Sequence, residues 1–249
     1  MTDLFDLSGK VAIVTGSTRG IGLGIGKALQ AAGASIVISS ESAAETARVA
    51  DELGAFGVGC DVTQPTDLQR LVGDTITRFG GIDILVCNAG IVGSRDADPL
   101  DDFDAVMAVN LRSMVALTNL ALPHMATRAD PSLILMASLS GLRGNGAINA
   151  YALAKAGVAQ LARNLAVQWG PKGVRTNAIS PGLIRTEFSE PLMADQAFMQ
   201  RRLHMTPLRR VGEIDDIAGA TLFLASKAGA FVNGHNLVVD GGTAITDGS

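Results

Sequence analysis

The chain has 249 residues, within the range of one α/β domain, and 47% of them are hydrophobic while 18% are charged. This balance supports a large apolar core and excludes a disordered chain. A net charge of −4, with no basic run longer than pairs such as Arg209-Arg210, argues against a nucleic-acid partner.

Targeting and redox signals are weak along the whole chain. Met1–Lys10 carries two Asp and no long apolar run, so no secretory signal peptide is expected, and no segment has the uninterrupted apolar sequence that crosses a bilayer. Cys60 and Cys87 lie in apolar stretches and are expected to be buried thiols. We therefore expect a cytoplasmic protein without a membrane partner. No metal site is expected either, because the histidines lack ligand spacing: His124, His204 and His235.

Short apolar runs alternate with longer helical patterns. Runs of this kind are typical of a parallel sheet that is buried on both faces. The expected strands are Val11–Thr15, Ser35–Ser39, Phe56–Cys60, Ile82–Cys87, Leu133–Ala137, Val174–Ile179 and Asn236–Asp240. The expected helices are Ile21–Ala32, Ala43–Leu53, Thr66–Phe79, Leu100–Met125 and Ala150–Trp169. The alternation predicts a single-domain α/β fold over residues 1–249, a Rossmann-type doubly wound parallel sheet with helices on both faces.

One segment interrupts this alternation. Glu187–Arg210 is rich in Met, Arg and Gln and contains no clear strand. We interpret it as a helical lid over the site, with an ordinary surface excursion as the alternative. Together with Leu139–Gly146, this lid is expected to form the substrate pocket.

A glycine-rich turn follows the first strand. It reads Gly16-Ser17-Thr18-Arg19-Gly20-Ile21-Gly22 and leads into a predicted helix. Glycines let the backbone approach a pyrophosphate closely, and a helix N-terminus supplies free N–H groups and a partial positive charge. At the first strand-to-helix junction, the turn predicts a dinucleotide phosphate site, although the spacing differs from G-x-G-x-x-G. A purely structural turn is the alternative.

A second group of residues carries proton chemistry. Tyr151 and Lys155 are four positions apart on a predicted helix and so share one face. A free phenol has a pKa of about 10, which a neighbouring ammonium lowers toward the neutral range. Ser138 follows a predicted strand at its carboxyl end, where its hydroxyl can bond a substrate oxygen. Alone, the Tyr–Lys pair would also fit an exposed helix face.

With these motifs in order, the chain resembles the classical short-chain dehydrogenase/reductase family from Lys10 to Gly242. The matching motifs are Thr15-Gly-x-x-x-Gly-Ile-Gly22, Asn88-Ala89-Gly90, Asn110, Ser138, Tyr151-x-x-x-Lys155 and Pro181-Gly-x-x-x-Thr186. The resemblance implies an oxidoreductase that uses NAD or NADP to interconvert a secondary alcohol and a ketone. It also implies a homotetramer.

The resemblance assigns roles residue by residue. Tyr151 would be the general acid/base and also a cofactor contact. Lys155 would lower its pKa and bind the nicotinamide ribose, and Ser138 would orient the carbonyl. Asn110 would hold a water that connects Lys155 to solvent. The other cofactor contacts would be Asp61, Val62, Asn88, Ala89 and Gly90 near adenine and the central sheet, and Pro181, Gly182, Ile184 and Thr186 near the nicotinamide.

The end of the second strand bears on the choice of cofactor. An acid there accepts a hydrogen bond from the ribose 2′-hydroxyl, whereas an arginine accommodates a 2′-phosphate. Ser40 and Glu41 occupy this position, and Glu41 would repel a 2′-phosphate. Arg19 in the glycine turn would attract one. We give Glu41 the greater weight and favour NAD over NADP.

Three other functions fit parts of the sequence. A 3-oxoacyl thioester reductase would need basic residues that meet a carrier, and Lys172 and Arg175 are candidates. A cofactor-binding protein without turnover would be expected to lack Tyr151 or Lys155, and both are present. A nucleotide-sugar epimerase or dehydratase usually needs a longer C-terminal substrate domain.

Overall fold

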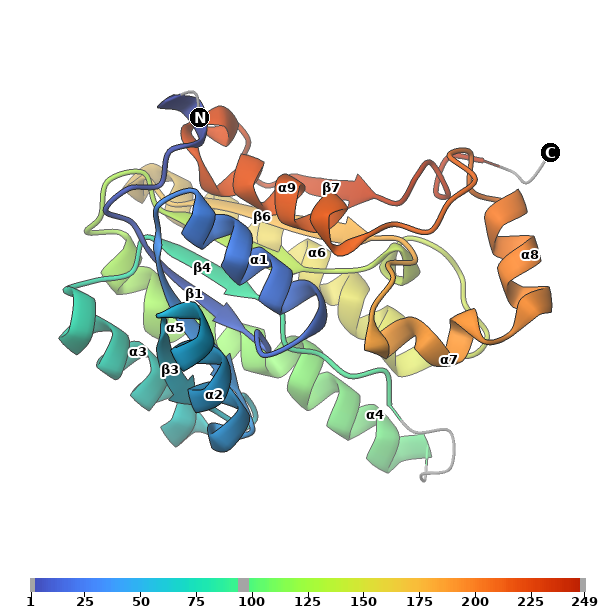
Figure 1. The fold of residues 1–249 in the computed structure, drawn as a ribbon, viewed down its shortest axis with the longest axis horizontal. Helices are drawn as coiled ribbons and strands as arrows, with labels where there is room; N and C mark the ends of the chain where they lie inside the picture. Colours follow the sequence, from blue (N-terminus) through green and yellow to red (C-terminus); the bar gives the residue numbers. More distant parts are fainter. Residues whose placement is uncertain (1–2, 94–98, 247–249) are drawn as a thin grey trace.

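Seven parallel strands form the central sheet in the computed structural model, which describes residues 3–93 and 99–246. The strands are β1 (Val11–Thr15), β2 (Ser35–Ser40), β3 (Phe56–Gly59), β4 (Ile84–Cys87), β5 (Ser132–Met136), β6 (Arg175–Pro181) and β7 (Asn236–Val239). Their order is β3-β2-β1-β4-β5-β6-β7 (Figure 1). The chain builds outward from β1 in one direction and then from β4 in the other, so the expected doubly wound sheet is confirmed.

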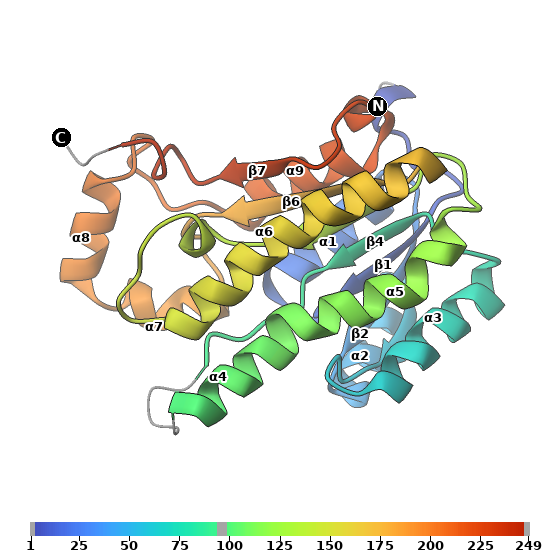
Figure 2. The ribbon, with the colours of Figure 1, turned by 180° about the vertical axis from the view of Figure 1, so that it is seen from behind.

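Helices cover both faces of the sheet. Helices α1 (Gly20–Ala31), α2 (Ala43–Leu53) and α9 (Ile214–Ala225) pack on one face, in front of the strands in Figure 1. Helices α3 (Pro65–Phe79), α5 (Ser113–Met125) and α6 (Asn149–Trp169) pack on the other, which faces the viewer in Figure 2. Neighbouring strand residues alternate between these two apolar layers, so Ala12 and Val14 face the first and Ile13 faces the second.

Most predicted elements match the structure within one or two residues. The fourth strand begins at Ile84 rather than Ile82, and the carboxylate of the intervening Asp83 accepts from the amide of Val11 at 3.0 Å. Helix α3 begins at Pro65, one residue before the predicted Thr66. Short 3-10 turns complete the described part at Asp3–Phe5, Leu139–Gly141, Gly170–Lys172, Glu187–Ser189 and Lys227–Gly229.

The helical stretch predicted at Leu100–Met125 is interrupted by a π-helical segment that the sequence pattern did not predict. It consists of α4 (Pro99–Met107), a π-helical segment (Ala108–Arg112) and α5. By length and composition alone, Pro99–Met125 would be long and apolar enough to span a membrane. In the fold, α5 instead contributes Leu117, Ala121 and Leu122 to the apolar layer on the sheet.

The segment predicted as a lid is helical. It contains α7 (Glu190–Met193) and α8 (Gln196–His204), and it lies beyond the carboxyl ends of β6 and β7 (Figure 1). Neither helix has a buried residue. Their stability therefore depends on how the two ends of the segment are held.

Candidate active site

The carboxyl ends of the strands bring the predicted site segments to one edge of the sheet. In doubly wound sheets, ligands bind outside this edge at the point where the strand order reverses, which is between β1 and β4 here. The segments that follow the strands there are Gly16–Gly22 after β1, Glu41 after β2, Asp61–Val62 after β3, Asn88–Gly90 after β4, Ser138 after β5 and Gly182–Thr186 after β6.

The glycine turn is tied to the neighbouring strands. The hydroxyl of Ser17 donates to the carbonyl of Val14 at 2.6 Å and accepts from the amide of Ser39 at 3.0 Å, which ties the turn to β2. The N-cap of α1 is Arg19, whose side chain makes no capping bond. The first amides of α1 therefore lack a side-chain cap, which suits an anionic ligand.

Close backbone contact explains the last glycine of the turn. A Cβ on Gly22 would lie 2.2 Å from the carbonyl oxygen of Gly16 and 2.6 Å from Nδ2 of Asn88. Asn88 Nδ2 donates at 3.0 Å to the carbonyl of Thr15 and at 3.0 Å to that of Gly16. The hydroxyl of Thr15 in turn accepts from the amide of Asn88 at 3.0 Å. The end of β4 thus holds the turn after β1 in place.

The residues around the predicted ribose and adenine positions are partly exposed. Glu41 is exposed directly after β2, and Ser40 is half-buried. Asp61 caps its own turn by accepting from the amide and the hydroxyl of Thr63 at 2.9 and 2.8 Å. Val62 beside it is half-buried. A dinucleotide therefore suits this edge, which offers an uncapped helix N-terminus, a close glycine backbone and acceptor groups after β2 and β3.

The predicted catalytic residues come together from β5 and α6. Ser138 Oγ accepts from the amide of Ser140 at 3.1 Å and is hydrogen-bonded with Tyr151. Lys155 is 3% exposed, and its Nζ donates to the carbonyl of Met136 at 2.7 Å. The same Nζ lies 5.5 Å from the centre of the Tyr151 ring. A hydroxyl, a phenol and a buried ammonium therefore share one small region.

Burial sets the acidity of these groups in the structure as it stands. It raises the pKa of Tyr151, and the hydrogen bond with Ser138 opposes that rise. It lowers the pKa of Lys155 from 10.5 to about 8. The pKa of Tyr151 thus moves upward, opposite to the lowering expected from its lysine neighbour, because desolvation of the phenolate outweighs the hydrogen bond with Ser138.

Asn110 lies in the π-helical segment and is completely buried. Its side-chain amide accepts from the N–H of Ile91 at 3.1 Å and donates to the carbonyl of Ile91 at 2.7 Å. A Cβ on Gly90 would lie 2.6 Å from Oδ1 of Asn110 and 3.5 Å from Nζ of Lys155. This packing connects the motif after β4 to Lys155, and sequence reasoning had not linked the two.

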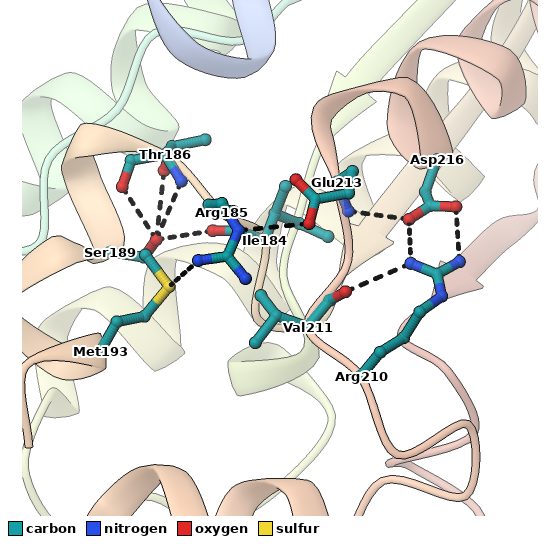
Figure 3. Close-up of polar contacts among 9 residues, drawn as sticks. All are labelled: Ile184, Arg185, Thr186, Ser189, Met193, Arg210, Val211, Glu213 and Asp216. Atoms are coloured by element: carbon teal, nitrogen blue, oxygen red, sulfur yellow. Dashed lines mark hydrogen bonds and ion pairs between the residues drawn. The ribbon is translucent and has the colours of Figure 1, made fainter. Parts of the chain in front are cut away.

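The segment after β6 leads into residues 187–210, the segment predicted as a lid, and several hydrogen bonds hold it. Pro181 ends β6, and a Cβ on Gly182 would lie 2.8 Å from the Cα of Asp240. Ile184 is buried, and its carbonyl accepts from the hydroxyl of Ser189 at 2.6 Å. The same hydroxyl accepts from the amide of Thr186 at 3.1 Å (Figure 3).

The far end of the lid is held by charged side chains. Arg210 donates to both carboxylate oxygens of Asp216, at 2.6 and 2.8 Å, and Asp216 also accepts from the amide of Glu213 at 2.8 Å (Figure 3). Arg185 Nε donates to Glu213 at 3.2 Å, which joins the two ends of the lid. This network is the lid base.

A cleft of about 200 Å³ opens between the turn that follows Ser138 and helix α8. Leu139 and Ser140 form one side of it, and Phe198 and Met205 form the other. Three arginines also line it: Arg143, Arg201 and Arg202. The sequence analysis had placed the pocket in these two segments but had not identified the arginines, whose proximity depends on tertiary packing.

Comparison with known proteins agrees with this geometry. The model of the family described as Enoyl-(Acyl carrier protein) reductase matches residues 16–244. The chain is 39% identical over 246 residues to 2-dehydro-3-deoxy-D-gluconate 5-dehydrogenase of Bacillus subtilis, covering 96% of each chain.

Two solved structures are similar over almost their whole length. A gluconate 5-dehydrogenase from Burkholderia cenocepacia in complex with NADP and tartrate has a TM-score of 0.91 and 36% identity, with 98% of each chain covered. A 7α-hydroxysteroid dehydrogenase complexed with NADH and 7-oxo glycochenodeoxycholic acid has a TM-score of 0.91 and 35% identity, with 97% of each chain covered. The chain belongs to the classical short-chain dehydrogenase/reductase family.

Proposed function

We propose that Tyr151 exchanges the proton in this NAD(P)-dependent oxidoreductase, which interconverts a secondary alcohol and a ketone. The observation that carries the proposal is the meeting of Tyr151, Ser138 and buried Lys155 at the carboxyl end of β5. The nicotinamide cofactor, when bound, gives or takes the hydride.

In ketone reduction, the Tyr151 hydroxyl donates its proton to the substrate oxygen as negative charge develops there. Ser138 bonds the same oxygen and is held for this by the amide of Ser140. The phenolate left on Tyr151 is stabilised by Lys155, a cation whose own charge is disfavoured by burial. A phenolate and an ammonium in one buried region stabilise each other. Lys155 therefore favours the ionised form of Tyr151 that remains after proton transfer.

Protons reach this pair from solvent through a water that Asn110 holds in our proposal, as the family resemblance implies. Because its side-chain amide is engaged by Ile91, we assign the water contact to the main-chain carbonyl of Asn110. The π-helical turn favours this assignment, since such turns displace carbonyls from the regular helical ladder.

The remaining contacts would follow the segments at the sheet edge. The Gly16–Gly22 turn would hold the pyrophosphate, Asp61–Val62 with Asn88–Gly90 the adenine side, and Pro181–Thr186 the nicotinamide. We favour NAD, because exposed Glu41 stands where a 2′-phosphate would lie. Arg19, the candidate for binding that phosphate, has its Nη1 3.8 Å from Glu187 in the lid.

We further propose one domain with a substrate lid at 187–210, a cytoplasmic location and a homotetramer. The exposed apolar side chains of α5 and α6 support the tetramer: Val115, Leu153 and Val167 are 39%, 53% and 80% exposed. Cys60 and Cys87 are both buried and unpaired, which suits a reducing compartment.

A thioester reductase with a carrier protein is the rival suggested by the description of the family model. Its candidate carrier contacts do not support it. Arg175 begins β6, at the edge opposite Ser138, and donates to the carbonyls of Leu224 and Gly229 at 2.7 and 3.0 Å. Lys172 packs over the ring of Trp169 at 4.2 Å.

Replacement of Tyr151 tests the central proposal. Tyr151→Phe removes only the hydroxyl, so we expect kcat to fall by about 10²–10⁴-fold. Fluorescence titration with NADH should stay within severalfold of the wild-type affinity, because the fold and the glycine turn are unchanged and only one cofactor contact is lost. A variant that keeps most of its turnover with a ketone would show that another group moves the proton.

Replacement of Glu41 tests the cofactor preference. Glu41→Arg should shift the ratio of NADPH to NADH affinity by about tenfold or more toward NADPH, since a repelling charge becomes an attracting one. Glu45→Arg makes the same charge change four residues later, at a half-buried position in the first turn of α2, and should leave the ratio unchanged. An unchanged ratio in Glu41→Arg would place the ribose away from this side chain.

A further inference from the structure

The cleft beside Ser138 carries a concentration of positive charge. Arg143 comes from the turn after β5, while Arg201 and Arg202 come from α8 in the lid. Within residues 3–93 and 99–246, none of these three forms an ion pair with a carboxylate. Three positive charges that lie close together repel each other, and an anion bound between them would relieve this repulsion.

Two of these arginines are held in place by the protein. Arg143 is half-buried, and its Nη1 donates to the carbonyl of Thr243 at 2.9 Å. Its other N–H groups form no hydrogen bond within the part of the chain that the structure describes. Arg202 is half-buried, and its guanidinium lies 5.4 Å from the centre of the Phe198 ring. Ordered guanidinium groups of this kind bind carboxylates through paired hydrogen bonds.

The charges interact with each other. Burial and then the charge of Arg143 lower the pKa of Arg202, and Asp240 opposes this. The carboxylate of Asp240 accepts from the amides of Gly242 and Ala244 at 2.8 and 2.6 Å, so it is already engaged by the main chain. An arginine remains charged at neutral pH despite such a shift. The cleft is therefore a built site for an anion rather than a neutral surface.

We propose that the substrate is an acid, a hydroxy or keto carboxylate whose carboxylate binds Arg143 and Arg202 while its reacting carbon lies at Ser138 and Tyr151. This inference rests on the proposed function of Tyr151 and adds the substrate class to it. Arg201, which is exposed on the same helix, adds positive charge at the mouth of the cleft. Leu139 and Ser140, which directly follow Ser138 in the chain, line the cleft, so the cleft begins next to the proposed reacting centre.

Binding calorimetry on the NADH complex tests this without turnover. Hydroxy acids and NADH are both reduced, so their ternary complex cannot react. The probes are matched pairs that differ in charge: 3-hydroxybutyrate beside 1,3-butanediol, and xylonate beside xylitol. At least one acid should bind about tenfold or more tightly than its neutral partner, and Arg202→Gln should remove that difference.

Matched variants separate charge from geometry. Arg143→Lys keeps the charge but loses the paired donors and should weaken acid binding severalfold, while Arg48→Gln on α2 makes a remote loss of charge and should change nothing. Thermal melting and NADH affinity show whether each variant is folded. Equal binding of acids and neutral partners by wild type, or acid affinity retained by both cleft variants, would overturn the proposal. Tyr151→Phe removes one hydrogen bond to the reacting oxygen but no charge, so it should keep the preference for acids over their neutral partners. Failure of the acid proposal and failure of the proton-transfer role are therefore distinct results.

Discussion

At the scale of the residue, the proposed role of Lys155 requires a buried charge that opposes stability. The side chain is 3% exposed, and burial lowers its pKa from 10.5 to about 8. A group whose folded pKa lies below its unfolded value weakens the folded state while it is protonated in both. That penalty is present below about pH 8 and disappears as pH rises toward the unfolded pKa.

This gives a prediction for Lys155→Met without cofactor. The variant should be more stable than wild type near neutral pH, because it buries no charge. Its advantage should shrink by about 3 kcal/mol as pH rises from about 7 to 10.5, which corresponds to the lowered pKa. Urea unfolding of both proteins across this range measures the difference, and effects of Tyr151 and the cysteines largely cancel. A difference independent of pH would mean that Lys155 titrates normally.

Candidate site residues were predictable from the sequence where a motif contains them. The contacts that these residues make were not predictable. Tyr151, Lys155 and Ser138 were identified from spacing and from position after a strand. The use of the Asn110 side chain to hold Ile91 was not, because it depends on a π-helical turn that brings two distant segments together. The raised pKa of Tyr151 likewise depends on burial, which sequence spacing does not report.

At the scale of the element, the proposed lid is held mainly by the lid base. Helices α7 and α8 have no buried residue, whereas Arg210 and Asp216 form a two-fold hydrogen-bonded ion pair at the end of the segment. That pair, with the amide of Glu213, lowers the pKa of Asp216 to about 2. Its contribution is therefore present above the unfolded pKa of about 4 and is lost as pH falls toward 2.

Asp216→Asn should loosen the lid without unfolding the protein. Exposed ion pairs contribute about 0–1 kcal/mol, so global stability should change little. Local opening should rise, and limited trypsin digestion should cut after Arg201 or Arg202 severalfold faster. Glu52→Gln removes an exposed ion pair on α2 and is the matched control. First cleavage outside 187–210 in Asp216→Asn would show that this pair does not hold the lid.

At the scale of the whole molecule, several apolar side chains are exposed on one side of the sheet. Helices α5 and α6 lie on the same side of the sheet (Figure 2). Val167 on α6 is 80% exposed, and Leu153 on the same helix is 53% exposed. Exposed apolar side chains that gather on one face mark interaction surfaces, and here the proposed occupant is a second copy of the chain.

Val167→Glu should disrupt that assembly. A charge buried at an interface without a partner is costly, so the tetramer should dissociate into smaller species. Light scattering coupled to size exclusion measures the mass of both proteins. Leu4→Glu, an exposed leucine in the N-terminal turn, should leave the mass unchanged. A wild-type protein that is monomeric in this measurement would contradict the proposed assembly.

The sequence by itself determined the strand–helix alternation, the glycine turn, the Tyr–Lys pair and the family, because these depend on local periodicity and on short motifs at fixed spacing. The tertiary structure decided which residues meet. It placed Asn110 against Ile91 and Gly90 and gathered Arg143 and Arg202 in one cleft. It also placed Arg175 at the edge of the sheet opposite to Ser138. The contacts at the site join segments that are far apart in the chain, because the parallel strands align their carboxyl ends along one edge of the sheet.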